Sequence, residues 1–474
     1  MLKKLLLVLM AAMMVFSFAA CGDKSNDPGE LVKLTWLVPG EEQPDMAAVL
    51  EKVNAITESK IGVTLDLQMI PQSAYEQRVK MMMASGSGFD ICFTSSWLNK
   101  YIDNARLGGY YDITDLVDKE LKNTMKQKIW DASMVDGRLY AVPNNQVMFT
   151  QLAVGLRKDL VEKYNFDINT INTIEDIEPF LELVKQNETG IYPYNNREFT
   201  APWTTDYMQS AGGVSLNYHF DTGEIVRFEE DPIARAAITK IREWYDKGYI
   251  RKDYMSAGQD TNVTDINQGK YAVMVEIWKP GIEYFSDKNA VQRVYKPITK
   301  AYFASPQATM TAISATCQYP EKAMELIKLV NLDKELFNLL CYGIEGQHYN
   351  LNEEGKLVPI DESGYASQGD WKFGNQFNAI LSAGMPDDVW EETNRLNEEA
   401  IVRPLDGYTF NPANVKFEMS QLSAGTGEFG YGPWVVAENE EEFLAKRNAH
   451  IDAAGFDKVR AEVERQVNEF LKNK

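Results

Sequence analysis

Cysteine and histidine are scarce in this sequence. Its 474 residues include four cysteines and three histidines, and no two cysteines have the C-x-x-C spacing. This argues against a disulfide framework and against a zinc site. Cys92 and Cys341 have apolar neighbours, as buried thiols do, and a bridge between Cys317 and Cys341 stays open. We expect no histidine-based acid–base chemistry, no metal site among the candidate residues and no cofactor; whether a structural ion is bound stays open.

The common catalytic motifs are also absent. The chain contains no phosphate loop of the G-x-x-x-x-G-K type, no G-x-S-x-G elbow and no H-E-x-x-H pair. Gly425, Gly427 and Gly430 match G-x-G-x-x-G, but no strand is predicted before them and the following Tyr431-Gly432-Pro433 is a poor helix start, which indicates a flexible loop. Adjacent acids such as Glu353-Glu354 are typical of a solvated face. We therefore predict no enzyme; a surface polysaccharide hydrolase, which needs two facing carboxylates, is the enzymatic alternative.

Long apolar runs are absent except at the N-terminus. Two lysines precede the uncharged run 5–20, which ends in two alanines before Cys21. This pattern predicts a signal peptide over residues 1–20, and the run is shorter than a spanning helix of about 20 apolar residues. Alanines followed by Cys21 resemble the bacterial lipobox, in which the cysteine receives lipid. We expect lipidation of Cys21, a flexible tether over residues 21–30, and a location on the extracytoplasmic face of the cell membrane; plain secretion is the alternative.

Basic residues are outnumbered by acidic ones. The chain has 48 Lys and Arg against 69 Asp and Glu, a formal net charge of −21. Such a surface repels nucleic acid and anionic lipid. We expect no nucleic-acid partner, and contact with the membrane through Cys21 alone. The length allows two or three domains' worth of core.

The residues that are present predict an α/β fold. Residues 32–38 read as a buried strand, and the apolar residues 46–56 follow the helical period up to Gly62. A strand over 63–69, a helix opened by a capping box of Ser73 and Glu76, and a strand over 89–93 complete a β-α-β-α-β opening, which predicts a parallel sheet covered by helices. Later elements are a helix beginning at Asp231-Pro232, a strand over 271–277, a helix from Glu321 preceded by Pro320, a loop-like stretch over 350–374 and a final helix over 459–470.

Several segments together resemble the extracellular solute-binding lipoproteins of ABC importers. The similarity is to the family 1-type, carbohydrate-class members with a tail domain, the LplA-like lipoproteins. It covers nearly the whole chain after the signal, and the order and spacing of the segments carry it more than any single one. The segments are ASGSGFDICFTSS (84–96), DGRLYAVPN (136–144), AVGLRKDLVEKY (153–164), QGKYAVM (268–274), YGIEGQHY (342–349), GNQF (374–377), FNPANVKFEMSQ (410–421) and AAGFDKVRAEVERQVNEFL (453–471).

The resemblance implies a type II fold of the periplasmic binding proteins, with two lobes of mixed sheets flanked by helices and a hinge between them. Lobe 1 is expected from residues 31–148 and 305–349. Lobe 2 is expected from residues 150–303 and 375–474, including a C-terminal helical region. The chain is expected to cross between lobes near residues 145–153, to return near 303–311, and to cross again after about Tyr349.

The resemblance also implies a monomer that captures a sugar or oligosaccharide by hinge closure and delivers it to the transmembrane subunits of an ABC importer. Capture of a peptide by the same scaffold is the alternative. The sequence does not identify the ligand or the partner permease.

Candidate ligand contacts are aromatic and polar residues near predicted strand ends. A sugar offers apolar C–H faces for stacking and hydroxyls that need polar partners. Trp97 and Trp371 rank first because they lie in polar, loop-like stretches, and with Trp97 we expect Asn144 and Asn145 to face the ligand. Packing within a lobe is the alternative for every tryptophan, and packing of the tail against a lobe is the alternative for Trp434. The candidate residues are Trp36, Ser95, Ser96, Trp97, Asn144, Asn145, Trp203, Tyr207, Trp278, Tyr349, Trp371 and Asn375.

Overall fold

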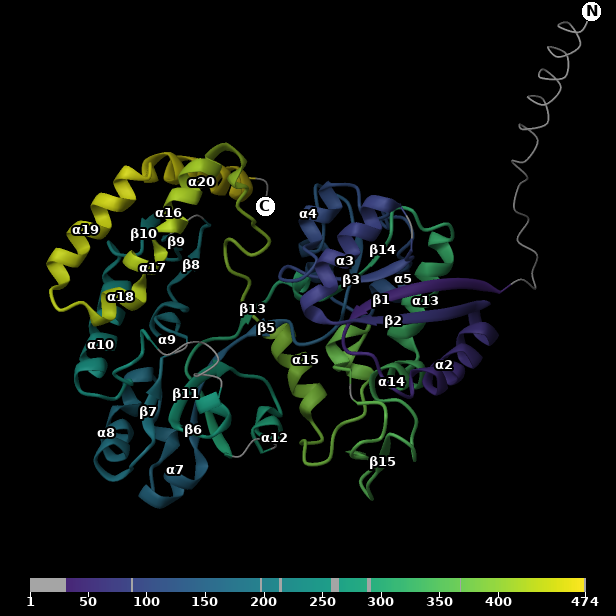
Figure 1. The fold of residues 1–474 in the computed structure, drawn as a ribbon, viewed down its shortest axis with the longest axis horizontal. Helices are drawn as coiled ribbons and strands as arrows, with labels where there is room; N and C mark the ends of the chain where they lie inside the picture. The colour runs from purple at the N-terminus through teal and green to yellow at the C-terminus, as the bar shows by residue number, and fades with distance from the viewer. Residues whose placement is uncertain are drawn as a thin grey trace, which may run out of the picture.

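Two lobes lie side by side, and three passes of the chain join them (Figure 1). The computed structural model describes residues 31–86, 88–196, 198–212, 215–256, 264–287, 291–366 and 368–472. The predicted signal peptide, Cys21 and the tether lie outside the described residues. Lobe 1 carries the N-terminal strand and lobe 2 carries the C-terminal helices. The expected two-lobe α/β architecture with mixed sheets is confirmed.

Lobe 1 is built on a five-stranded sheet with the order β2-β1-β3-β14-β4. β1 pairs in parallel with β2 and β3, whereas β14 runs antiparallel to β3 and β4. The predicted β-α-β-α-β opening is therefore correct. The strands are β1 (Val32–Pro39), β2 (Val63–Ile70), β3 (Ile91–Thr94), β4 (Ala141–Pro143) and β14 (Met310–Ile313). The helices of this lobe are α2 (Met46–Ile61), α3 (Gln72–Ser85), α4 (Tyr101–Arg106), α5 (Lys119–Lys122), α6 (Gln127–Ala132), α13 (Pro320–Leu332) and α14 (Lys334–Tyr342).

The start of α3 differs from the prediction. Pro71 occupies the N-cap position with extended backbone, and no side chain caps the helix. Because the helix begins at Gln72, Ser73 already lies in its first turn and cannot act as the cap. Glu76 instead pairs with Lys80 one turn later, with 2.6 Å between Oε1 and Nζ.

Lobe 2 contains a four-stranded sheet with the order β12-β6-β11-β7. Its core includes Phe180, Tyr194 and Trp244, all fully buried. The predicted helix start is confirmed, since the Asp231 carboxylate accepts hydrogen bonds from the first backbone N–H groups of α10. The strands are β6 (Leu152–Arg157), β7 (Tyr192–Asn195), β11 (Tyr271–Ile277) and β12 (Arg293–Pro297). The helices are α7 (Lys158–Tyr164), α8 (Glu178–Asn187), α9 (Ala201–Thr204), α10 (Pro232–Asp246) and α12 (Ile282–Asp287).

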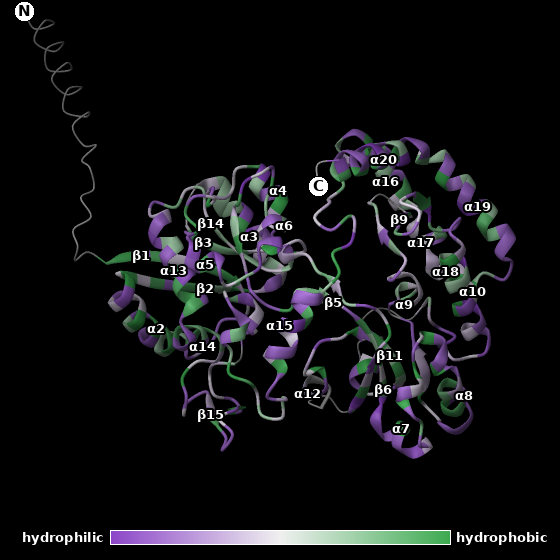
Figure 2. Cartoon of the chain, turned by 180° about the vertical axis from the view of Figure 1, so that it is seen from behind, coloured by the Kyte–Doolittle hydropathy of each residue, from purple (hydrophilic) through white to green (hydrophobic). Residues whose placement is uncertain are grey.

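Hydropathy follows this layering. Hydrophobic residues are frequent on β1 inside lobe 1, whereas α7 at the edge of lobe 2 is largely hydrophilic (Figure 2).

Cys92, Cys317 and Cys341 are buried and carry free thiols, so the bridge left open between the last two does not form. Burial raises the pKa of the Cys92 thiol to about 12, as expected for an unreactive buried thiol.

The hinge is made of three extended chain passes. β5 (Phe149–Thr150) pairs antiparallel with β13 (Tyr302–Phe303). On its other side, the Phe303 N–H donates to the Ile401 carbonyl at 2.9 Å. The first two passes, at residues 149–150 and 302–303, lie at or next to the ranges expected for the crossings, 145–153 and 303–311. The third lies at Ile401, far beyond Tyr349.

The late third crossing changes the division into lobes. The stretch 375–400, expected in lobe 2, packs on lobe 1: Ala379, Leu396 and Ala400 belong to the same core cluster as Trp36. The physical reason is the apolar face of helix α15 (Val389–Glu399), which is buried on lobe 1. The hairpin β15 (Tyr349–Leu351) and β16 (Leu357–Pro359), with the short helices η4 (Asp370–Lys372) and η5 (Gln376–Asn378), also lies on lobe 1.

The segment 404–472, called the C-terminal unit below, packs on a small sheet of lobe 2. Leu405, Val459 and Val463 share a core with Leu216 and Ile225 of that sheet. The sheet has the order β10-β9-β8. Its strands are β8 (Met208–Ser210), β9 (Leu216–His219) and β10 (Ile225–Arg227), and the helices are α16 (Lys416–Ala424), α17 (Thr426–Phe429), α18 (Tyr431–Val436), α19 (Glu440–Ala453) and α20 (Phe456–Lys472).

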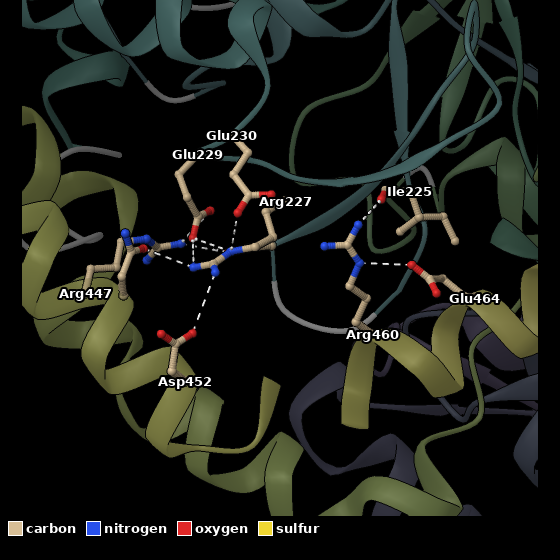
Figure 3. Close-up of polar contacts among 10 residues, drawn as sticks. Ile225, Arg227, Glu229, Glu230, Arg447, Asp452, Arg460 and Glu464 are labelled. Atoms are coloured by element: carbon tan, nitrogen blue, oxygen red, sulfur yellow. Dashed lines mark hydrogen bonds and ion pairs between the residues drawn. The ribbon is translucent and has the colours of Figure 1, made fainter. Parts of the chain in front are cut away.

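Buried charges reinforce this junction (Figure 3). The Glu229 carboxylate lies 2.8 Å from the Arg227 guanidinium and 3.5 Å from that of Arg447 on α19. The side chains of Glu229 and Arg447 are only 4 % and 5 % exposed. Since a buried charge is costly without a partner, the cluster holds α19 in one place on lobe 2.

The glycine-rich stretch around Gly430 is helical, which corrects the expected flexible loop. Gly430 is the N-cap of α18, so Pro433 falls in the first turn. Proline is tolerated there because the first helical N–H groups have no partner within the helix. Trp434 is fully buried against Ala234 and Ile238 of α10, which is the packing role that the sequence left open.

Candidate functional site

Two tryptophans and a phenylalanine form an aromatic cluster at the edge of the lobe 1 sheet. The ring centroids of Trp97 and Trp371 lie 6.2 Å apart, inclined by 56°. Phe93 lies behind both, at 6.1 and 5.8 Å. Trp97 is 46 % exposed, and its indole N–H donates to the Ala308 carbonyl at 2.8 Å, next to the hinge. The cluster therefore offers a fixed, accessible ring face where β3 ends, the sheet edge at which ligands bind in open α/β folds.

Ser95 positions this ring and does not face solvent. Its fully buried hydroxyl accepts hydrogen bonds from the N–H groups of Trp97 and Leu98 and donates to the Leu98 carbonyl. The neighbouring Ser96 is exposed, and its backbone N–H donates to the Gln307 carbonyl at 2.7 Å. The Ser95 hydroxyl thus holds the turn that carries Trp97 from within lobe 1, and the Ser96 backbone N–H holds it to the hinge.

Asn144 and Asn145 hold the other tryptophan in place. The Asn144 Nδ2 donates to the carbonyls of Trp371 and Lys372 at 3.1 and 2.9 Å, and its Oδ1 accepts from Thr311. The Asn145 Nδ2 donates to the Thr124 carbonyl and, at 3.2 Å, to Oδ1 of Asn375. Both asparagines are buried. Their amides bind the protein, so the structure gives them and Asn375 a supporting position beneath the site.

The remaining candidates are scattered. Trp36 is 1 % exposed in the core of lobe 1 and packs edge-on against Phe373. Trp203 lies against Trp244 inside lobe 2 and donates its indole N–H to Glu175. Tyr349 is buried in β15. The structure places these three side chains away from the aromatic cluster.

Of the last two candidates, Trp278 lies at the junction of the lobes and Tyr207 lies on lobe 2. Trp278 follows β11 of lobe 2, yet its half-buried ring packs against the core of lobe 1. Its backbone N–H donates to the Gln151 carbonyl at 2.7 Å, beside the first hinge pass. Tyr207 is 45 % exposed on lobe 2, just before β8.

Sequence reasoning missed Asp370 and Lys279, which bring opposite charges together from the two lobes. Asp370 precedes Trp371 on η4, and its carboxylate accepts hydrogen bonds from Gln376 at 2.8 Å and Tyr342 at 3.4 Å. Burial raises the pKa of the Asp370 carboxyl, and the Lys279 ammonium of lobe 2 opposes that rise. Burial in turn lowers the pKa of Lys279. Neither residue forms a motif, because they are far apart in sequence.

A small polar cavity adjoins Ser96, the residue before Trp97. Its volume is about 260 Å³. Lobe 1 contributes Ser96 and the hinge contributes Phe303, while Gln209 of β8 and the segment 403–409 close the remaining walls. Within the described residues no group of three or more His, Cys, Asp or Glu side chains is arranged to hold a metal ion.

Comparisons with known proteins agree with this architecture. The model of the family described as bacterial extracellular solute-binding protein matches residues 40–335. A model for a domain of unknown function matches residues 404–472, the C-terminal unit. A carbohydrate ABC transporter substrate-binding protein of Streptococcus pneumoniae is 28 % identical, and the match covers 96 % of each chain. The polygalacturonan/rhamnogalacturonan-binding protein YtcQ of Bacillus subtilis is 22 % identical, over 84 % of this chain and 82 % of that protein.

Among solved structures, this chain is similar to the N-glycan transport solute binding protein NgtS of Streptococcus pneumoniae. The identity is 26 %, the TM-score is 0.80, and the match covers 93 % of this chain and 99 % of that one. The same protein in complex with Man1GlcNAc matches with a TM-score of 0.71 at the same coverage. Since the first family model spans more than half of the chain and both lobes have the expected fold, this protein belongs to the bacterial extracellular solute-binding protein family.

Proposed function

We propose that this protein captures a neutral sugar or oligosaccharide between its lobes and delivers it to an ABC importer. The observation that carries the proposal is the exposed, rigidly held Trp97 ring beside Trp371, at the edge of lobe 1 next to the hinge. Ring faces suit the apolar C–H face of a sugar, whose burial yields about 25 cal/mol per Å². Relatives named as carbohydrate and N-glycan binding proteins support the same ligand class.

The polar groups around the aromatic cluster fit a ligand rich in hydroxyls. Asp370 and Gln376 lie beside Trp371, and Lys279 faces them from the other lobe. One positive and one negative side chain balance each other, which favours an uncharged ligand over an acidic one. Bound hydroxyls would need such partners, because an unpaired buried polar group costs about 1–3 kcal/mol.

Capture requires the lobes to move, and the hinge is suited to that. Its three passes are short extended segments that can change their backbone angles together. The NgtS structure named without a ligand matches this chain with a TM-score of 0.80, and the complex with Man5GlcNAc with 0.65, at equal identity and nearly equal coverage. Two lobes that move relative to each other would produce such a difference, which supports closure around ligand.

Anchoring to the membrane through lipid on Cys21 is part of the same proposal. Lipid on Cys21 would hold the protein at the outer face of the cell membrane, where the importer opens, and two acyl chains suffice for stable anchoring. In the described part of the chain, none of the helices combines the length and the apolar composition needed to cross a bilayer. Replacement of Cys21 by serine should release the protein from the cell into the medium, and retention of the variant on the membrane would contradict the anchor.

Binding is tested by calorimetry of the purified protein against neutral oligosaccharides and short peptides. Micromolar binding of an oligosaccharide corresponds to about 8 kcal/mol, and it should be weakened by Trp97→Ala. The control Leu107→Ala removes another exposed apolar side chain of lobe 1, at the end of α4, and should bind as the wild type does. Binding of peptides alone would favour the peptide alternative. Release of smaller sugars from the bound glycan would identify a hydrolase.

A further inference from the structure

The polar cavity beside the aromatic cluster is bounded by three parts of the molecule that are distant in sequence. Ser96 and Ala132 come from lobe 1, and Phe303 and residues 305–307 come from the hinge. The opposite wall belongs to lobe 2 and the C-terminal unit, whose role is unassigned. The lining residues from that wall are Gln209, Arg403, Leu405, Asp406, Gly407, Tyr408 and Thr409.

A hydrogen-bonded network makes this opposite wall rigid. The Gln209 Nε2 donates to Oδ1 of Asp406 at 2.9 Å, and its Oε1 accepts from the Leu405 N–H at 3.2 Å. Asp406 also accepts from the backbone N–H and the Nε of Arg403, at 2.7 and 3.2 Å. The Arg403 guanidinium lies 5.3 Å from the Tyr302 ring centroid at the hinge. One carboxylate and one guanidinium give this wall no net charge.

Two hydroxyls on the rim are available to a ligand. Ser96 and Thr409 are exposed, and neither hydroxyl forms a hydrogen bond with another described residue. They face the cavity from lobe 1 and from the C-terminal unit, respectively. A neutral wall with hydroxyls at its rim matches a ligand that both donates and accepts hydrogen bonds and carries no charge.

The cavity adjoins the proposed sugar site, because Ser96, which lines it, directly precedes Trp97 in the same turn. The Ser96 N–H and the Trp97 indole N–H are fixed to two consecutive hinge carbonyls, those of Gln307 and Ala308, at 2.7 and 2.8 Å. A chain of sugars lying on Trp97 can therefore extend past Ser96. At about 260 Å³, the cavity is smaller than sites for whole drug-sized ligands, which begin near 300 Å³. It has room for one sugar unit and not for a whole oligosaccharide.

We infer that the C-terminal unit selects ligands by their length. In the bound complex, the cavity takes the terminal unit of a neutral oligosaccharide, and an inner unit of the same oligosaccharide lies on Trp97. This inference rests on the proposed sugar-binding function. It gives the C-terminal unit a part in ligand selection besides its packing on lobe 2. Affinity should therefore increase with glycan length until the cavity is filled, and residues 403–409 should control that increase.

The test fills the cavity from the exposed side. Thr409→Tyr places a bulky side chain at its mouth, and Thr409→Ser is the matched control that keeps the hydroxyl. Kd is measured by calorimetry for neutral glycans of increasing length from one series, beginning with the shortest that the wild type binds. For Thr409→Tyr we expect wild-type affinity for the shortest glycan and about tenfold weaker binding of the longer ones. The shortest glycan also shows that the variant is folded.

The outcomes separate this inference from the proposed function. If glycans bind and Thr409→Tyr follows the wild type at every length, the length-reading cavity is wrong while sugar binding stands. An equal loss at every length, including the shortest, also contradicts it, because the substitution would then act on the Trp97 site itself. If the wild type binds no glycan of the series, both proposals fail.

Discussion

Two tryptophan pairs of nearly equal ring geometry have different roles in this molecule. Trp97 and Trp371 have centroids 6.2 Å apart at 56°, and Trp203 and Trp244 have centroids 5.6 Å apart at 60°. The first pair lies on the open edge of lobe 1, with Trp97 46 % exposed. The second pair lies inside lobe 2, with Trp244 fully buried. Ring geometry therefore does not distinguish a binding surface from a core, whereas access to solvent does.

The hydrogen bonds of the two pairs show the same contrast. The Trp97 indole N–H is satisfied by a backbone carbonyl at the hinge, which fixes the ring and leaves its face open. The Trp203 indole N–H donates to the Glu175 side chain within lobe 2. One arrangement prepares a rigid surface for a partner and the other completes a packed interior. Substitution of each pair should separate these roles.

Truncation of the buried pair should have the largest effect on stability. Trp244→Ala removes a fully buried ring from the core of lobe 2. Large-to-alanine changes of this kind lower the free energy of unfolding by about 3–5 kcal/mol. Urea unfolding followed by circular dichroism measures the loss. A loss for Trp97→Ala as large as that for Trp244→Ala would contradict the division into surface and core.

Removal of a buried charge should have the next largest effect on stability, because that charge also belongs to the interior of lobe 2. Arg447→Met keeps much of the side-chain volume but removes one of the two partners of Glu229. Breaking a buried ion pair costs about 3–5 kcal/mol, and the remaining Arg227 should reduce the loss to roughly 2–3 kcal/mol. The control Arg465→Met removes an exposed arginine paired with Glu462 and Glu469 on α20, and should change stability little. Equal unfolding midpoints for the two variants would show that the cluster does not hold α19.

The exposed pair should affect binding and not folding. Trp97→Ala is expected to weaken binding of the captured oligosaccharide about tenfold, which corresponds to about 1.4 kcal/mol. Its unfolding midpoint should stay near that of the wild type, because the ring is half exposed. Trp203→Ala truncates the half-buried partner of Trp244 in the core of lobe 2, and should lower the midpoint while leaving Kd unchanged. Calorimetry and thermal unfolding of both variants measure the two quantities, and the reverse pattern would overturn the assignment of the site.

The elements that the sequence predicts well are those with local causes. The alternation of Val63, Leu65 and Leu67 predicts β2, and the carboxylate of Asp231 before Pro232 predicts the start of α10. In both, the pattern and the structure involve residues within a few positions of each other. The failed capping box at Ser73 is also local, because Pro71, two residues before Ser73, occupies the N-cap position.

The features that the sequence does not predict arise from contacts between distant segments. The third hinge pass exists because Ile401 pairs with residues of β13, and no periodicity near Tyr349 reveals that. In the sequence, Trp97, Trp371 and Asn144 all lie in polar surroundings, but the fold directs the Asn144 amide to the carbonyls of Trp371 and Lys372. The sequence shows which polar residues lie near a strand end, but only the fold shows which of them are open to a ligand and which support the site from within.

The smallest expected effect concerns the charge pair beside the exposed tryptophans. Burial raises the pKa of Asp370 above its ordinary value near 3.9, with Tyr342 and Gln376 bonded to the carboxylate and Lys279 facing it from lobe 2. The folded protein therefore holds this proton at a higher pH than the unfolded chain does. Its contribution to stability is fully present below the unfolded pKa and is lost as the pH rises through the folded pKa. Asp370→Asn cannot ionise, so its free energy of unfolding should fall less than that of the wild type between about pH 4 and pH 7.

Urea titrations at several pH values measure this difference, with Asp361→Asn as a control that removes an exposed carboxylate and the same charge. A steeper fall for Asp370→Asn than for the wild type would show that the attraction of Lys279 outweighs burial. The site would then carry an ion pair between the lobes that stabilises the folded protein at neutral pH. A shallower fall, which we expect, would show that burial of the Asp370 carboxyl outweighs the attraction of Lys279.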